Sequence, residues 1–226
     1  MRRLGGLVLM CVAAASPLLG QRSALREVRS GGSAGLTFVI AQPLGEFERN
    51  GAVAVGLTMY GVFPLDRSGA LGLRLDGDYM MYDADYRGYG VSTSSSIGTL
   101  AVGPQVTFGR GPLRLYGFAT VGGSAFWTSV SFDRYCGCYY GDDFILDGHF
   151  TTVTQVGSGI LINLGGRRRR TPVSIDLGVR DMRHDLVKYV PAGGVTDNGD
   201  GSYTVDRVET PVSMRVFQIG VSFGIR

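Results

Sequence analysis

Alternation of large apolar and small polar residues near the C-terminus constrains the fold of this chain more than any other feature. From Pro211 to Arg226, one parity is bulky and the other is small or polar: Phe217, Ile219, Val221, Phe223 and Ile225 against Gln218, Gly220, Ser222 and Gly224. Successive side chains of a β-strand point to opposite faces of its sheet. The pattern therefore predicts a strand that meets a different environment on each side.

The alternation recurs along the chain, and we expect eight strands: 34–42, 51–62, 70–83, 96–108, 113–128, 149–164, 172–187 and 210–225. Short turns follow the second, fourth and sixth strands, at 64–69, 109–112 and 165–171. Longer segments follow the odd-numbered strands, the longest being 129–148 and 188–209. An even strand count with this asymmetry is typical of an antiparallel up-and-down transmembrane β-barrel with short periplasmic turns and long extracellular loops.

A soluble, lipocalin-like barrel would show the same alternation with its apolar face turned inward around a ligand. Its wet face would need many charged residues, but Lys188 is the only lysine and the chain has four glutamates. Aromatic residues gather where two membrane interfaces would lie: Phe63, Phe108 and Phe223 at the turn ends, and Tyr79, Trp127 and Phe150 at the loop ends. We therefore predict that the apolar face contacts lipid.

The N-terminus has the pattern of a secretory signal. Arg2 and Arg3 precede an apolar stretch at 4–15 that is too short to span a bilayer and ends in small residues. We expect a cleaved signal at 1–20, a flexible periplasmic leader at 21–33 and a barrel domain at 34–226. Loss of the two arginines lowers the formal net charge from +3 to about +1, so the overall charge does not indicate nucleic-acid binding.

Three runs carry a resemblance to known families: VGPQVTF at 102–108, LYGFATVGG at 115–123 and FQIGVSFGIR at 217–226. They resemble small eight-stranded outer-membrane barrels, which include the OmpA-like transmembrane domain and the opacity or porin-like surface proteins. The resemblance covers 34–226 and implies the outer membrane as location, with lipid and the barrel assembly machinery as partners. Two features depart from it, because Phe223 is followed by Gly-Ile-Arg in place of a terminal aromatic residue and no peptidoglycan-binding domain is appended.

Six charged residues fall on the inward parity of the expected strands: Arg74, Asp76, Asp78, Arg114, Asp176 and Arg180. Three positive and three negative charges balance, and an eight-stranded interior is just wide enough for side chains to fill. We predict an ion-pair plug, with a gated or proton-sensitive polar pore as the alternative. Pro104 has no edge strand to occupy in a closed barrel, so we also predict a local bulge there.

Two further sets of basic residues lie near the ends of the expected strands. Arg183 and Arg215 fall on the outward parity near the loop rim, where they are candidates for binding lipopolysaccharide phosphates or for ordinary rim charges. Arg167 to Arg170 form a run within a short turn, which predicts a solvated periplasmic turn.

The long loops contain two local signals. Cys136 and Cys138 are the cysteines left after signal removal, and an oxidising export route allows a disulfide across one glycine, two unpaired thiols or, with further ligands, a metal site. The run TDNGDGSYTVD at 196–206 contains Asn-Gly and Asp-Gly pairs, which predict a hairpin; its aspartates only loosely match a calcium loop.

The function is expected to reside in the long loops, which are rich in tyrosine: Tyr86, Tyr89, Tyr135, Tyr139 and Tyr140. A structural or surface-interaction role through an extracellular ligand or protein is the first hypothesis, and a narrow channel for small solutes is the second. A lipid A-modifying enzyme needs a nucleophile and base at the lipid edge. His149 and His184 fall on the inward parity, and the residue two positions after His149 is Thr151, where a serine would be needed. We therefore expect that the protein is not an enzyme, and we expect no cofactor or metal.

Overall fold

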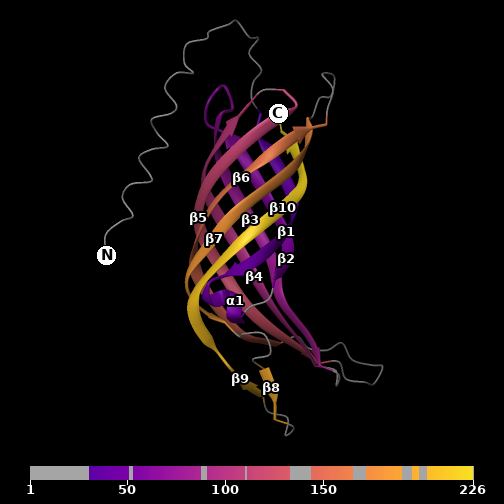
Figure 1. Cartoon of the computed structure of the whole chain (residues 1–226), viewed down its shortest axis with the longest axis vertical. Coiled ribbons are helices and arrows are strands. Elements are labelled where there is room, and N and C mark those ends of the chain that lie inside the picture. The colour runs from indigo at the N-terminus through magenta and orange to yellow at the C-terminus, as the bar shows by residue number, and fades with distance from the viewer. Residues whose placement is uncertain are drawn as a thin grey trace, which may run out of the picture.

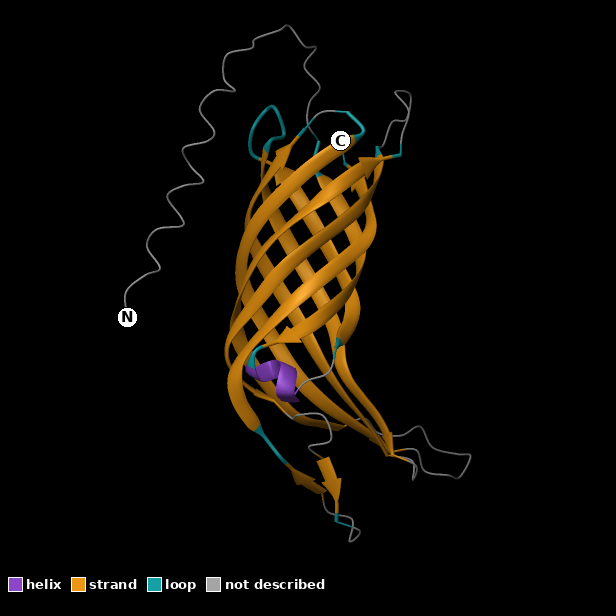
Figure 2. Cartoon of the chain, viewed as in Figure 1, coloured by secondary structure: helices purple, strands orange, loops and turns teal. Residues whose placement is uncertain are grey.

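The computed structural model describes residues 31–50, 53–87, 91–109, 111–132, 144–164, 172–189, 195–198 and 203–225. Eight long antiparallel strands close into one barrel, in the order β1-β10-β7-β6-β5-β4-β3-β2 (Figures 1 and 2). Their bounds are β1 (Ser33–Leu44), β2 (Ala54–Pro64), β3 (Leu71–Arg87), β4 (Val91–Phe108), β5 (Leu113–Phe132), β6 (Phe144–Asn163), β7 (Val173–Tyr189) and β10 (Val208–Gly224). The predicted all-β, up-and-down architecture is confirmed.

The two ends of the barrel differ. The short connections lie at the same end as the start of β1 and the end of β10, and we call it the turn end (Figure 1). The opposite loop end carries α1 (Glu46–Asn50) and a hairpin of β8 (Val195–Asp197) and β9 (Tyr203–Val205). The hairpin predicted around 196–206 is therefore confirmed, with Asp197 opposite Tyr203. Within the described residues, no helix is long and apolar enough to cross a bilayer.

Several strands are longer than predicted at the loop end. The clearest case is β4, which begins at Val91 and includes the serine-rich run Ser92–Ser96. This run pairs with β3 on one side and with β5 on the other. Its residues have no alternation of apolar and polar side chains, so the sequence pattern alone could not show that they continue the strand.

The predicted bulge at Pro104 is wrong. Pairing between β4 and β5 stops at Gly103 and Pro104 but resumes in the same register, with Val102 opposite Val121 and Gln105 opposite Phe118. A Cβ atom at Gly103 would overlap the carbonyl oxygen of Ala119, so the glycine lets the two backbones approach closely beside the proline. The register shifts lie in the loop half of the barrel, at Met81/Asp83, Thr128/Ser129 and Pro211/Ser213.

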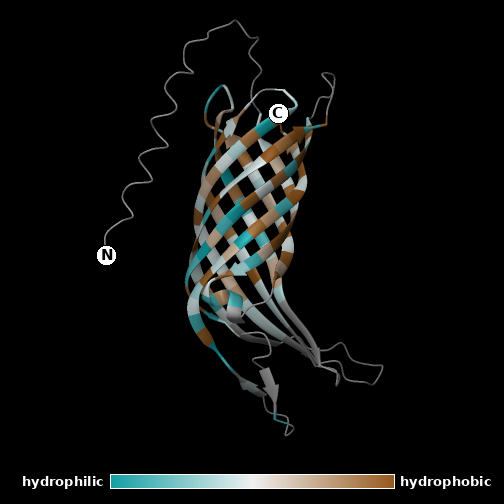
Figure 3. Ribbon diagram, in the orientation of Figure 1, coloured by the Kyte–Doolittle hydropathy of each residue, from teal (hydrophilic) through white to brown (hydrophobic). Residues whose placement is uncertain are grey.

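The character of the lumen changes sharply along the barrel axis. On seven strands a buried polar or charged inward residue is followed, at the next inward position toward the loop end (two residues along the strand), by an apolar one. The paired positions are Thr37/Val39, Asp78/Met80, Thr99/Ile97, Ser124/Phe126, Gln155/Val153, Arg180/Met182 and Gln218/Val216. Seven of the eight barrel strands thus switch from a polar to an apolar inward residue partway along their length, and we call the two parts of the lumen the polar section and the apolar section. Each section has exceptions: Tyr116, Phe118 and Leu161 are buried on the turn side, and Thr151 and His184 on the loop side. The ribbon coloured by hydropathy shows the alternation of hydrophilic and hydrophobic residues along the strands (Figure 3).

Candidate functional site

An ion pair spans the polar section near the level of the switch. Arg180 on β7 donates from Nη2 to Asp78 Oδ1 on β3 at 2.6 Å. Thr58 on β2 donates to the same carboxylate at 2.6 Å and accepts from Arg180 Nη2 at 2.9 Å. Both charged side chains are fully buried. A buried pair of this kind compensates its desolvation only when further hydrogen bonds support it, and Thr58 supplies them from a third strand.

A second ion pair lies closer to the turn end. Arg74 donates from Nε to both carboxylate oxygens of Asp76, at 2.8 and 3.0 Å, and from Nη1 to Gln105 Oε1 at 3.0 Å. Its guanidinium carbon lies 4.1 Å from the ring centroids of both Tyr60 and Phe118. Two aromatic faces therefore hold the cation in place across the lumen.

Asp176 is held by tyrosines. Tyr60 and Tyr116 donate their hydroxyls to its two carboxylate oxygens at 2.6 and 2.7 Å, and Gln218 donates from Nε2 at 3.5 Å. The structure thus brings five of the six lumen charges together in the polar section but forms two ion pairs rather than three. Arg114 lies apart, half-buried at the turn-end mouth.

An apolar plug fills the loop-end section of the lumen. Phe47 of α1 is fully buried, with its ring centroid 5.8 Å from that of Tyr82 and 5.2 Å from that of Tyr189. Glu46 accepts a hydrogen bond from Thr210 on β10 at 2.5 Å, which ties α1 to the barrel rim. The plug consists of Val39, Ala41, Phe47, Ala54, Met80, Tyr82, Ile97, Phe126, Val153, Met182, Val187, Tyr189, Val212, Met214 and Val216.

Sequence reasoning missed the plug, although a signal was present. Along the last strand, Val212, Met214 and Val216 continue the inward parity of Gln218 but are apolar. At the same level the outward residues become polar, as at Arg215. The reversal of parity within one strand indicates that the outer environment changes partway along the barrel.

The two histidines differ in burial, because His184 is buried and His149 is partly exposed. His184 contacts Ser124 Oγ through Nε2 at 3.1 Å and the Val212 carbonyl oxygen through Nδ1 at 3.3 Å. The barrel wall and the Phe126 ring, 5.1 Å away between centroids, enclose this serine–histidine pair. His149 contacts the Leu186 carbonyl at 3.3 Å. Among the described residues, no three His, Cys, Asp or Glu side chains could hold a metal together.

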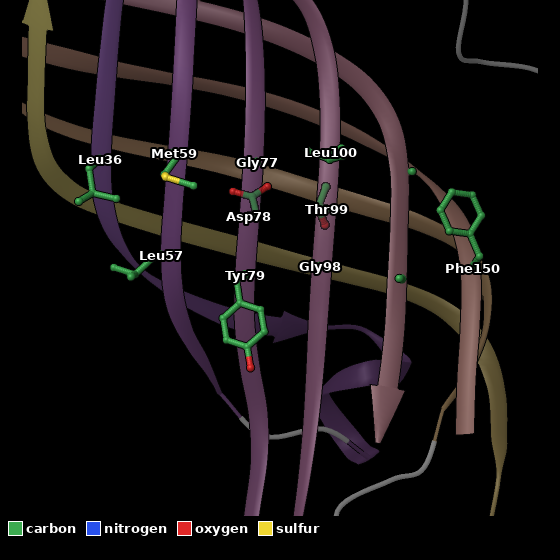
Figure 4. A pocket seen from close by; sticks show the side chains of 12 residues that line it. Leu36, Leu57, Met59, Gly77, Asp78, Tyr79, Gly98, Thr99, Leu100 and Phe150 are labelled. Atoms are coloured by element: carbon green, nitrogen blue, oxygen red, sulfur yellow. The ribbon is translucent and has the colours of Figure 1, made fainter. Parts of the chain in front are cut away.

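The outer wall carries an apolar groove of about 640 Å³ that runs across β1 to β6 (Figure 4). Large side chains border it on both sides: Leu36, Leu57, Met59, Tyr79, Leu100 and Phe150. Gly77, Gly98 and Gly123 lie between them on the outward face. The Trp127 ring packs over Gly98, 3.1 Å from the place a Cβ would take, and the Phe150 ring packs over Gly123 in the same way.

The rim arginines lie on neighbouring strands of the outer face. Arg215 forms a two-point pair with Asp181, at 2.8 Å from Nε and 3.2 Å from Nη2. Arg183 is exposed one register step away, opposite Ser213. Both face outward at the level where the outer wall becomes polar, and their contact with lipopolysaccharide stays a prediction.

Several predicted features lie outside the described residues. These are the signal segment, the leader up to residue 30, the cysteines Cys136 and Cys138, the run Arg167–Arg170, and the tyrosines at 89, 135, 139 and 140. Tyr86 lies in β3, but its side chain is not among those described.

No protein-family model and no curated protein matches this chain. Solved structures do match. The crystal structure of Neisserial surface protein A is 14% identical, with a TM-score of 0.51 over 87% of this chain and 98% of that chain. The chain has the fold of a small eight-stranded outer-membrane barrel.

Two further barrels align over similar lengths. A major outer membrane protein from Thermus thermophilus is 12% identical, with a TM-score of 0.46 over 86% of this chain and 99% of that chain. Ail, the attachment invasion locus protein of Yersinia pestis, is 11% identical, with a TM-score of 0.44 over 86% of this chain and 97% of that chain. The resemblance inferred from the three sequence runs is confirmed at the level of the fold by the Neisserial barrel.

Proposed function

We propose that this chain is an exported outer-membrane protein that presents a surface at the loop end, and that its barrel anchors this surface without conducting solutes. The observation that carries the proposal is the double closure of the lumen. Ion pairs and tyrosines fill the polar section, and the apolar plug with Phe47 fills the section above it. A lumen filled along its axis serves as a scaffold rather than a passage.

The outer face supports a membrane position for the turn half. Large apolar side chains there are strongly exposed, as at Met59 (67%), Leu100 (69%) and Val121 (58%). Exposed apolar surface of this extent requires a nonpolar environment. About 9–11 residues per tilted strand cross a bilayer, whereas the barrel strands contain up to 20. The remaining length carries the polar outer wall, including the Arg215–Asp181 and Lys188–Glu209 pairs, beyond the apolar band.

The loop end is the part that would meet partners outside the cell. Tyr86 and the loop tyrosines at 89, 135, 139 and 140 are the candidate contacts with a polysaccharide or protein. A disulfide between Cys136 and Cys138 would stiffen the third long loop. Arg183 and Arg215 would bind lipopolysaccharide phosphates at the boundary of the apolar band, and the barrel assembly machinery would insert the chain after removal of residues 1–20.

Planar-bilayer recording tests the proposal against the second candidate, a narrow solute channel. The purified protein should first migrate faster on an SDS gel unboiled than boiled, which shows a closed barrel. We then expect no steady conductance, because the plug excludes water from the loop-end section. Steady single-channel conductance from protein with this gel behaviour would replace the scaffold role by the channel role.

The lipid A-modifying alternative is tested separately. The Ser124–His184 pair is enclosed by the barrel, so it lacks access to a lipid substrate. We expect lipid A from cells with and without the protein to give identical mass spectra. A mass change that depends on His184 would show that the pair becomes accessible and would establish an enzyme.

Surface display tests the loop role directly. Cells that display the wild-type protein should adhere to a polysaccharide- or protein-coated surface more strongly than cells that display a variant with serine at 135, 139 and 140. A control variant with serine at Tyr79, on the outer wall of the barrel, should adhere like wild type. Equal adhesion of all three strains and of cells without the protein would remove the surface-interaction role.

A further inference from the structure

A vestibule of about 350 Å³ opens at the turn end of the lumen, where the ends of most strands meet. Its polar lining consists mainly of hydroxyl groups and one amide: Ser33, Ser68, Ser174, Ser222, Thr107 and Gln105. Among the described residues that line it, Arg114 is the one charged residue and none carries a carboxylate. Ser68 Oγ already donates to Asp66 and Gln105 Nε2 to Thr107, so the mouth offers an anion the guanidinium together with the hydroxyls of Ser33, Thr107 and Ser174.

Arg114 has no hydrogen bond or ion pair with any residue in the described part of the chain, and its Nε is buried without a partner. The two other lumen arginines, Arg74 and Arg180, each bind an aspartate. The remaining acid, Asp176, is held by two tyrosine hydroxyls. Buried nitrogens of Arg74 and Arg180 also lack acceptors, but among these three arginines Arg114 is the one with no acceptor at all in the described part of the chain. A guanidinium without any acceptor at the edge of a cavity points to a missing ligand.

The packing beneath Arg114 prevents it from reaching inward. Leu161 on β6 pairs with Arg114 on β5 and with Asp176 on β7, so it lies directly between them. Leu161 packs with Tyr116 and Phe118 in a small buried cluster, which separates the vestibule from the ion-paired section. An anion that enters from the turn end would thus meet Arg114 and the hydroxyls without competition from the interior carboxylates.

We propose that the turn-end vestibule binds a small oxyanion of the phosphate class through Arg114. The planar guanidinium offers parallel N–H donors that match two oxygens of a phosphate, and the surrounding hydroxyls can donate to the others. The phosphate is supplied either as the free ion or as the headgroup of a phospholipid on the turn side of the membrane. This site is separate from the loop-end surface, and its test does not depend on whether the barrel conducts.

Phosphorus NMR of inorganic phosphate added to the full-length barrel in a maltoside detergent, at constant ionic strength, provides the test. Wild type should broaden the phosphate signal in a saturable manner, and Arg114→Gln should weaken the binding at least about tenfold, as expected for the loss of a charge-assisted pair. Arg114→Lys, which keeps the positive charge but loses the parallel N–H donors of the guanidinium, should bind phosphate with intermediate strength. Lys188→Gln removes one exposed positive charge at the opposite, loop end of the barrel and should bind like wild type.

Displacement by dihexanoyl phosphatidic acid identifies the source of the phosphate. If dihexanoyl phosphatidic acid displaces inorganic phosphate at a concentration at least about tenfold lower than the phosphate concentration, the ligand is a lipid headgroup. Weaker displacement would assign the free ion. Unboiled SDS-gel mobility checks that each variant is folded. Absence of saturable broadening with wild type, or equal broadening with folded Arg114→Gln, would overturn the proposal.

Discussion

At the residue scale, the same side-chain types behave differently according to their surroundings. Arg180 and Arg215 each pair with an aspartate, at 2.6 and 2.8 Å. The first pair is fully buried, whereas the side chains of the second are 48% and 40% exposed. Removal of one partner from a buried pair leaves an uncompensated charge, but water replaces the lost partner at an exposed pair.

Arg180→Met should therefore destabilise the barrel by about 3–5 kcal/mol, because Asp78 would stay buried without its cation. Arg215→Met, the matched control, should cost about 0–1 kcal/mol. Urea unfolding in lipid vesicles, followed by the loss of fast gel migration, measures both. The double variant Arg180→Met/Asp78→Leu should recover much of the loss, and an Arg180→Met barrel as stable as wild type would refute the ion-pair plug.

The β2–β3 turn offers a test of pH dependence outside the strands. The Ser68 hydroxyl, and after it the Leu71 backbone N–H at 2.9 Å, hold the pKa of Asp66 below its ordinary value of 3.8. A depressed carboxylate pKa contributes stability that is present above the unfolded pKa and is lost as pH falls through the folded pKa. In Asp66→Asn, the urea concentration at the unfolding midpoint should fall less steeply below about pH 4 than in wild type. An equally steep fall in both proteins would contradict this.

At the scale of the elements, α1 is a helix of only five residues and yet closes the lumen. It follows Gly45, whose φ of +66° turns the chain back over the barrel mouth. Five residues cannot form a stable helix alone. The burial of Phe47 between Tyr82 and Tyr189 therefore supplies the stability of this element.

Phe47→Ala should remove a large buried side chain and leave a cavity in the plug, at a cost of about 3–5 kcal/mol. We expect this cost to appear first as local opening of 45–53, seen as faster hydrogen exchange there, since the barrel strands pair independently of α1. The exposed neighbour Glu48 provides the control, because Glu48→Ala should change the exchange little. Equal protection in both variants would show that Phe47 does not hold the plug closed.

At the scale of the whole molecule, the reversal of parity divides the barrel into two halves with different outer surfaces. In the turn half the outer wall is apolar and the lumen is mainly polar, apart from the Tyr116–Phe118–Leu161 cluster. In the loop half the lumen is mainly apolar, with His184 among the polar exceptions, and the outer wall of β7 and β10 is polar. The level at which Phe217 gives way to Arg215 should therefore mark the edge of the hydrocarbon region.

Single cysteines introduced at Ile219 and Arg215, in a background with serine at 136 and 138, test this boundary. Both side chains face outward on the same strand. A fluorophore at 219 in nanodiscs should be quenched by brominated acyl chains, and a fluorophore at 215 should be quenched by aqueous iodide. Quenching of both positions by iodide alone would place the turn half in water and favour the soluble barrel.

The sequence by itself determined the strands, their antiparallel order and the polar inner wall of the turn half, because side-chain alternation is a local property with a period of two residues. It also placed the loop hairpin, because Asn-Gly and Asp-Gly pairs act within a few residues. The longer limits of β4 were not predicted, since serines such as Ser94 and Ser95 become strand residues through pairing with both neighbours.

Tertiary structure alone decided which inward residues meet. Asp78 and Arg180 are 102 positions apart in the chain, and Tyr60 and Asp176 are 116 apart. Parity placed these side chains in one lumen but could not give their heights, which depend on the stagger between strands around the closed barrel. The same stagger left Arg114 at the mouth, where no acid of the described residues pairs with it, and brought Phe47 over the opposite opening. Both the candidate anion site and the plug therefore emerge only when the sheet is closed.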